Sequence, residues 1–204
     1  MKRFYGSAAF TGIVWLFARI LLAYEFIPSG WGKLFGSSSA VWVGAKAGTA
    51  VTGFLNNALT LATGEHPAVS QWYAWAIQNL LLPSAGVFTY LVAIGEVLIG
   101  IALLIGVFTR LTTSMALLMN MAFFYAGTVS SLPYVLPLEI AILLIGSYVG
   151  YIGVDGLVLA RRLKWFKLPE DGQPSQGAAR LWEVVTPVII VIWVALLLLA
   201  IVWK

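Results

Sequence analysis

Five long apolar stretches dominate the pattern of hydrophobic and polar positions along this chain. A helix of about 20 apolar residues crosses the hydrocarbon core of a bilayer, and each stretch is long enough to do so. The predicted spanning helices are Tyr5–Ile27, Gly86–Phe108, Leu111–Val129, Tyr134–Val154 and Glu183–Trp203. The pattern therefore predicts an all-α, polytopic membrane protein that lies in the lipid bilayer.

The loop at 28–85, between the first two spans, contains two amphipathic segments. In the first, apolar residues recur at helical spacing, at Val51, Phe54, Leu55, Ala58 and Ala62. The second carries Trp72 and Trp75, and tryptophan favours the membrane interface. We expect both segments to lie along the outer surface as a lid over the bundle. The alternative is a lipid-facing anchor with no other role.

The amino-acid composition agrees with a membrane protein and excludes several kinds of cofactor site. Of the 204 residues, 61% are hydrophobic and 10% are charged, whereas a soluble domain carries about 25% charged residues. The chain has no cysteine, which excludes disulfides, iron–sulfur clusters and cysteine-ligated zinc. The single histidine, His66, cannot form a bis-histidine haem site within one chain. The sequence thus predicts no metal site.

The basic residues predict the orientation, because cytoplasmic loops carry an excess of lysine and arginine. With a cytoplasmic N-terminus in the plasma membrane, eight basic residues outside the spans lie inside, and Lys33, Lys46 and Lys204 lie outside. Five spans then place the C-terminus outside. The net charge of +4 therefore reflects topology and does not indicate nucleic-acid binding.

The C-terminal part is predicted to differ from the bundle. Residues 161–182 are basic and then rich in proline, glycine and glutamine, and we expect a cytoplasmic linker there. Residues 183–204 form the fifth spanning helix, which is almost wholly apolar. Such a helix has no polar side chain to bury, so it is expected to pack on the outside of the bundle or to dock a partner.

Polar side chains inside the spans are the candidate functional residues, since a charge at the bilayer centre costs about 2.5–3.5 kcal/mol and usually faces the bundle interior. They are Arg19, Glu25, Glu96, Asn120 and Glu139, with Asp155 at the inner end of the fourth span. At about 1.5 Å per residue, Arg19, Glu96 and Asn120 are expected to share the midplane, with Glu25 and Glu139 above them. Asp155 is expected to be a capping or interface residue.

Two interpretations of this polar set are open. Arg19 and Glu96 can form a buried ion pair that only fixes the register of two helices. Alternatively, the set forms a pocket that binds an anion or a quinone head group and moves protons. One arginine cannot neutralise three acids, so the surplus predicts a carboxyl that keeps its proton, which suits proton uptake or release.

Three runs of residues resemble the DoxX/DoxD type of membrane protein. The runs are Arg19-Ile20-Leu21-Leu22 with Phe26-Ile27-Pro28-Ser29-Gly30 and Lys33-Leu34; Glu96-x-x-Ile99-Gly100-x-x-Leu103-x-x-Gly106-x-x-Thr109-Arg110; and Gly150-x-x-Gly153-x-Asp155. The resemblance covers Arg19 to Asp155. It implies a DoxX-like four-helix transmembrane bundle over residues 1–160, with the fifth helix beyond it.

The best-described activity of DoxD-type members is that of the membrane subunit of thiosulfate:quinone oxidoreductase, an enzyme of sulfur metabolism. It joins two thiosulfates into tetrathionate and passes two electrons to quinone. The resemblance therefore implies quinone as electron acceptor, a small anionic substrate and a second subunit. This chain shows no evident redox metal site, so electrons would pass directly between substrate and quinone or through a partner.

The resemblance also implies roles for the polar residues. Arg19 would hold the anionic substrate or the quinone carbonyl through its several donors, and Glu96 would orient Arg19. Glu25 and Glu139 would take up protons. The implied quinone-binding residues are Arg19, Asn120, Trp72 and Trp75.

Two further functions stay open. One is a non-enzymatic structural or assembly subunit of a membrane complex, docked through the fifth helix. The other is a small carrier of protons or anions, to which buried carboxylates are also suited. The sequence shows no inverted repeat and no pair of broken helices of the kind that transporters use.

Overall fold

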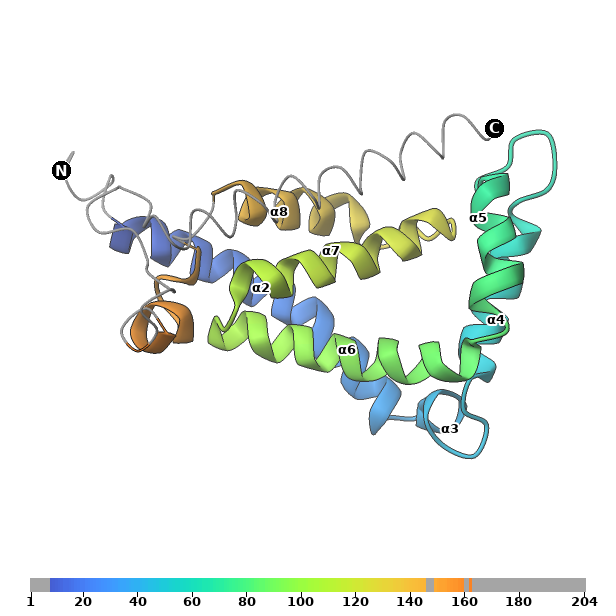
Figure 1. Ribbon diagram of the computed structural model, residues 1–204, viewed down its shortest axis with the longest axis horizontal. Helices are drawn as coiled ribbons and strands as arrows, with labels where there is room; N and C mark the ends of the chain where they lie inside the picture. The colour runs from blue at the N-terminus through green and yellow to red at the C-terminus, as the bar shows by residue number, and fades with distance from the viewer. Residues whose placement is uncertain (1–7, 146–148, 160–161, 163–204) are drawn as a thin grey trace.

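The computed structural model describes residues 8–145, 149–159 and 162 (Figure 1). Four long helices follow one another in the predicted order: α2 (Ala8–Leu34), α6 (Ala85–Ile105), α7 (Thr109–Tyr125) and α8 (Leu132–Ile145). α2 packs along α6, and α7 lies between α6 and α8. The described residues form no strand, so this part of the chain is an all-α bundle.

Shorter helices connect α2 to α6 and lie at one end of this bundle. They are α3 (Ser39–Trp42), α4 (Thr49–Thr60), α5 (Gln71–Ala76) and the π-helix η1 (Ile77–Leu81). Figure 1 shows α4 and α5 crosswise to the long helices, over their ends. The spacing of apolar residues explains the packing of α4, which buries Val51, Leu55 and Ala58 on one face.

Two groups of buried apolar side chains hold the fold together. The first lies between the long helices and includes Leu22, Leu103 and Ile142. The second lies under the crosswise helices and includes Leu55 and Ile77. Fully burying a side chain of this kind contributes about 1.5–3 kcal/mol, so the crosswise helices are fixed to the bundle by a core of their own.

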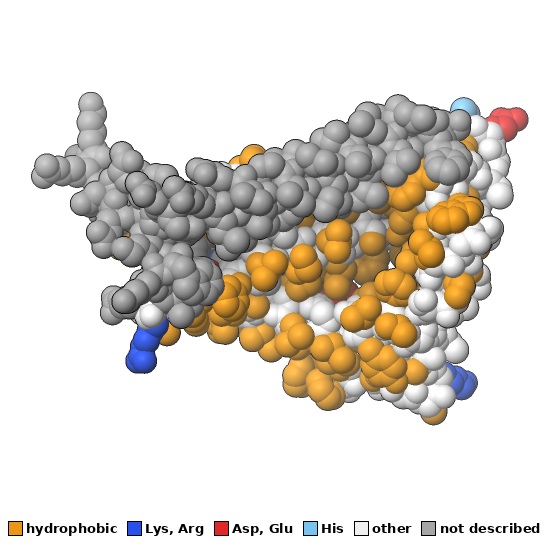
Figure 2. All heavy atoms as spheres, in the orientation of Figure 1, with side chains coloured by type: hydrophobic (Ala, Val, Ile, Leu, Met, Phe, Trp, Pro, Cys, Tyr) orange, Lys and Arg blue, Asp and Glu red, His pale blue; other side chains and the backbone are white. Residues whose placement is uncertain are grey.

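The outside of the bundle is apolar. Large side chains such as Phe17, Leu98 and Leu144 are exposed on the long helices. In Figure 2, hydrophobic side chains are gathered over the coloured part of this face, and most of the visible charged side chains lie at its margins. An apolar surface of this extent is typical of contact with lipid. Two described helices, Gly12–Leu34 and Ala85–Ile105, are long and apolar enough to cross a membrane.

The first helix is longer than the sequence predicted. Its end was expected at Ile27, before the proline, but α2 continues through Pro28 to Leu34. The reason lies in its packing against α6. Gly30 lies so close to that helix that a Cβ at residue 30 would be 2.8 Å from the backbone nitrogen of Val97. The interhelical contact keeps the extra turns helical.

The observed bounds of the other helices agree in part with the predicted spans. α6 begins one residue before its predicted start, and α7 begins two residues before its own. α8 is described only to Ile145, and residues 149–159 form a short turn and the π-helix η3 (Asp155–Leu159), so the fourth helix does not continue regularly to Val154. Apart from residue 162, the predicted linker at 161–182 lies outside the described residues, as does the fifth helix at 183–204.

Candidate functional site

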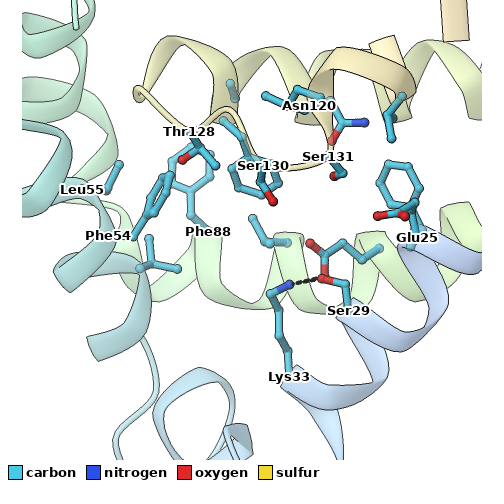
Figure 3. A pocket seen from close by; sticks show the side chains of 18 of the residues that line it. Glu25, Ser29, Lys33, Phe54, Leu55, Phe88, Asn120, Thr128, Ser130 and Ser131 are labelled. Atoms are coloured by element: carbon cyan, nitrogen blue, oxygen red, sulfur yellow. Dashed lines mark hydrogen bonds and ion pairs between the residues drawn. The ribbon is translucent and has the colours of Figure 1, made fainter. Parts of the chain in front are cut away.

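A cavity of about 630 Å³ lies between α2, α6, α7 and the crosswise helices. Aromatic side chains form much of its wall, and polar side chains gather on the side of α2 and of the 128–131 segment (Figure 3). The polar residues are Glu25, Ser29, Lys33, Glu96, Asn120, Thr128, Ser130 and Ser131. A mostly apolar cavity of several hundred Å³ with a few convergent polar groups is the usual form of a small-molecule site.

Helical spacing places the cavity-lining residues of α2 and α6 on two facing stripes. Glu25, Ser29 and Lys33 are four residues apart on α2, and Val92 and Glu96 are four apart on α6. Residues at this spacing share one face of a helix. Because α2 and α6 pack closely along their lengths, the two stripes meet at the cavity.

Lys33 and Glu96 form an ion pair in the cavity wall. The Lys33 Nζ lies 2.5 Å from the Glu96 Oε2, and the two side chains are 15% and 4% exposed. The same Nζ donates a hydrogen bond to the Ser29 Oγ at 2.6 Å and lies 5.0 Å from the centre of the Trp42 ring. From the sequence, Lys33 was expected to lie outside the membrane and was one of the residues of the family resemblance, but no role in the site was predicted for it. If the first helix had been predicted to continue past Pro28, the spacing of Lys33 from Glu25 would have placed both residues on one face of it.

Glu25 lies at the edge of the cavity. It is half-buried, and its Oε1 accepts a hydrogen bond from the hydroxyl of Tyr134 on α8 at 2.6 Å. This contact links α2 to α8. Among the described residues that line the cavity, Glu25 and Glu96 are the acidic side chains and Lys33 is the one basic side chain.

Asn120 and Glu139 form a second polar layer behind the cavity wall. Asn120 lines the cavity, and its Nδ2 donates a hydrogen bond to the Glu139 Oε1 at 2.7 Å. Glu139 is fully buried, and its Oε2 has no hydrogen-bond partner among the described residues. Two residues expected at different depths are therefore direct neighbours.

Arg19 lies away from the cavity and does not pair with Glu96, so the buried ion pair that was one of the two open interpretations is not formed by these two residues. It is 1% exposed, and it donates hydrogen bonds to the carbonyl oxygens of Val149 at 2.9 Å and of Ile152 at 2.7 Å. The register of α2 on α6 explains the difference. Gly30 packs on Glu96, whereas Arg19 packs on Gly106, where a Cβ would lie 2.5 Å from the Arg19 Nη1.

Asp155 caps the start of α7, which confirms its expected role as a capping residue. Its carboxylate accepts hydrogen bonds from the backbone nitrogens of Phe108 at 2.6 Å and of Thr109 at 2.8 Å. Residue 155 follows the spanning helices, in η3. Burial raises the pKa of Asp155, and the Thr109 and Phe108 amides and the charge of Arg19 oppose that rise.

The residues around Arg19 and Asp155 form one structural unit, which we call the Arg19–Asp155 node. Its members are Arg19, Gly106, Thr109, Gly150, Gly153 and Asp155. The glycines permit close approach, since a Cβ at residue 150 would lie 2.6 Å from the Asp155 Oδ2 and one at residue 153 would lie 2.9 Å from the Gly106 Cα. Six of the motif residues that carry the family resemblance are therefore used to join α2, α7 and the segment after α8.

The two tryptophans that were expected at the quinone site lie beside the cavity without lining it. Trp72 is half-buried and packs on the rings of Tyr73 and Tyr125, with centroids 5.3 and 5.2 Å away. Trp75 is 57% exposed. From this segment Tyr73 lines the cavity and donates a hydrogen bond to the Ala122 carbonyl at 2.9 Å. Burial, with a smaller effect of Tyr125, raises the pKa of Tyr73 to about 12, so its hydroxyl stays a donor at neutral pH.

The described residues contain no group of three or more histidine, cysteine, aspartate or glutamate side chains that could hold a metal ion. What these residues build is a largely apolar cavity with an ion pair in its wall, inside an all-α bundle with an apolar exterior.

The fold and the site thus define an all-α membrane protein with a polar centre between its helices. Within this class, the DoxX family model matches residues 14–129, which is more than half of the chain, and the chain belongs to the DoxX family. The comparisons with curated proteins and with solved structures gave no match.

Proposed function

We propose that this chain is the membrane subunit of a quinone-linked oxidoreductase and that its cavity binds the head group of the quinone. The observation that carries the proposal is the Lys33–Glu96 ion pair in the wall of an aromatic cavity of about 630 Å³. An ion pair in such a place is costly unless it orients donors toward a ligand or fixes the fold.

The residues around the cavity fit a quinone. A quinone head group is a flat, neutral ring with carbonyl oxygens, and it takes up two electrons and two protons when it is reduced. The Lys33 ammonium offers donors to a carbonyl oxygen, and it has three N–H groups of which the structure uses two. Phe54, Phe88 and Phe123 offer apolar faces for a ring.

The same residues can supply protons. The Lys33 Nζ lies between the Glu96 Oε2 and the Ser29 Oγ and donates a hydrogen bond to each. Glu25, half-buried at the edge, is placed to exchange protons between the outside and the cavity. We therefore assign proton donation to Lys33 and proton exchange to Glu25. Lys33 also takes the binding role that the family resemblance implies for Arg19.

An anionic donor suits the cavity less well than a neutral ring. Glu25 and Glu96 outnumber Lys33 there, and Arg19 is bound to backbone carbonyls elsewhere. A dianion such as thiosulfate would meet net repulsion. We propose that such a donor reacts on a second subunit, which the fifth helix at 183–204 would dock. The proposal keeps the N-terminus in the cytoplasm and the C-terminus outside the plasma membrane.

The test is quinone binding to the purified full chain in lipid nanodiscs, measured by tryptophan fluorescence with ubiquinone-1 and a short-chain menaquinone. A hydrogen bond from a charged group is worth about 1.5–3 kcal/mol, so Lys33→Met is expected to weaken binding about 10- to 150-fold. Lys46→Met, which changes an exposed lysine in the α3–α4 connection, is the matched control and should bind as the wild type does.

Turnover is measured with the same proteins, with thiosulfate as donor and with candidate partner subunits added. Reduction that depends on the donor and is lost in Lys33→Met supports the proposal. Equal quinone affinity in Lys33→Met and wild type would refute the assigned site, and absence of quinone binding by the wild type would refute the proposed function.

A second candidate function is a structural or assembly subunit without catalysis. The Arg19–Asp155 node favours it, because several motif residues of the family, among them Arg19 and Asp155, serve internal contacts there. Under this alternative, Arg19→Ala lowers the abundance of the protein and of its complex, and the wild type binds no quinone.

A further inference from the structure

Glu139 and Asn120 form a pair in which the buried acid lies directly behind a residue of the cavity wall. The Asn120 Nδ2 donates to the Glu139 Oε1 at 2.7 Å. Because the nitrogen end of the amide is turned to Glu139, its oxygen end is left toward the cavity (Figure 3). Glu139 is fully buried, and its Oε2 has no hydrogen-bond partner among the described residues.

This arrangement leaves an ionised Glu139 poorly stabilised. A buried carboxylate requires a cation or several donors, and within the described part of the chain Glu139 has one neutral donor. A proton on Oε2 would be a buried donor without an acceptor among the described residues. A proton on Oε1 can instead be donated to the Oδ1 of Asn120. The amide must turn over to present it, since an asparagine amide has donors at one end and an acceptor at the other.

We propose that Glu139 is a positioning residue whose proton decides which end of the Asn120 amide faces the cavity, and thereby which redox form of the quinone binds better. This inference rests on the proposed function. With Glu139 ionised, the Asn120 oxygen faces the cavity and accepts a hydrogen bond from a hydroxyl, as in a quinol. With Glu139 protonated, the Asn120 nitrogen faces the cavity and donates to a carbonyl, as in a quinone. One proton is bound and no electron moves.

The other charged groups on the surrounding helices have partners of their own. On α2 and α6 these contacts are Arg19 with the carbonyls of Val149 and Ile152, Glu25 with Tyr134, and Lys33 with Glu96; on α7 the contact is Arg110 with the carbonyl of Leu143. Any pH dependence that these groups cause is shared by the wild type and by a Glu139→Gln variant. The difference between the two proteins therefore isolates Glu139.

The experiment measures the Kd of ubiquinone-1 and of ubiquinol-1 for the full chain in nanodiscs, over about pH 5 to 9, the range in which a buried carboxyl titrates. In the wild type, the ratio of the two Kd values is expected to change about tenfold across this range, the equivalent of one hydrogen bond exchanged. In Glu139→Gln and in Asn120→Ala the ratio should stay constant within about twofold. Glu65→Gln, at an exposed position, should keep the wild-type change.

Infrared spectroscopy measures the protonation of Glu139 directly and needs no quinone. The stretch of the protonated Glu139 carboxyl is identified by its loss in Glu139→Gln. It should titrate in the wild type and shift in Asn120→Ala.

Each contrary outcome has one meaning. If the change of the Kd ratio with pH is the same in Glu139→Gln as in the wild type, the inference is overturned. It is also overturned if the wild-type ratio stays constant while the infrared band of Glu139 titrates. Asn120→Ala keeps the test available if Glu139→Gln does not fold. A wild type that binds neither form refutes the proposed function itself.

Discussion

Replacement of Asp155 by alanine tests how much the Arg19–Asp155 node contributes to folding. The carboxylate accepts hydrogen bonds from the buried Thr109 amide and from the partly buried Phe108 amide, and it lies in the field of the Arg19 guanidinium. Asp155→Ala removes all three interactions and leaves both amides at the start of α7 without this acceptor.

The expected loss follows from these contacts. A buried amide without an acceptor costs about 1–3 kcal/mol, and loss of the helix cap with its favourable charge at the N-terminus costs about 0.5–2 kcal/mol. These values overlap, because the cap and the amide bonds are partly the same interaction, so we expect a total of about 2–4 kcal/mol. Asp155→Asn, which keeps one acceptor oxygen, should lie between the wild type and the alanine variant.

The assay is reversible unfolding of the purified protein in mixed detergent micelles, followed by circular dichroism, and it yields the free energy of unfolding. Glu65→Ala, which removes an exposed acidic side chain, is the control and should stay within about 0.5 kcal/mol of the wild type. A loss below about 0.5 kcal/mol in Asp155→Ala would refute the structural role of the node.

Three further predictions concern single positions. Gly106→Ala should cost about 2–4 kcal/mol in the same unfolding assay, because residue 106 has a φ of 70° and no room for a Cβ; Gly86→Ala, where a Cβ meets nothing within 4 Å, should be neutral or slightly stabilising. Tyr134→Phe removes the hydrogen bond that links α8 to α2 at the cavity edge, and it should speed quinone exchange in stopped-flow fluorescence while the exposed control Tyr24→Phe leaves the rate unchanged. Because the pKa of Tyr73 is raised to about 12, its contribution to stability should be complete below about pH 10 and lost as pH approaches 12; a Tyr73→Phe variant that loses stability over the same alkaline range as the wild type would contradict this.

Much of the bundle follows from the sequence because its causes are local. α6 ends just before Gly106, and α7 begins at Thr109. The left-handed φ of Gly106 explains why the chain turns between the two helices. The spacing of Val51 and Leu55 also indicated the helix that lies across the bundle end. Each of these features depends on neighbouring residues alone.

The residues that make up the site could not be predicted from the sequence, because they depend on the register between helices. Depth along a span placed Arg19 level with Glu96, but α2 extends past Pro28, and Gly30 is the residue that packs on Glu96. This shift moves Arg19 to the Arg19–Asp155 node and brings Lys33 into the cavity. A proline at residue 28 normally favours a helix end, and only the close contact of the two helices overrides that preference.

The most direct test of the account is photoaffinity labelling of the full chain in nanodiscs with a short-chain azidoquinone, mapped by mass spectrometry. We predict labelling of the cavity-lining residues of α4 and α6, displaced by unlabelled quinone and strongly reduced in Lys33→Met. Labelling centred on the Arg19–Asp155 node, or spread over the lipid-facing surface and insensitive to competing quinone, would contradict the assignment of this cavity as the quinone site.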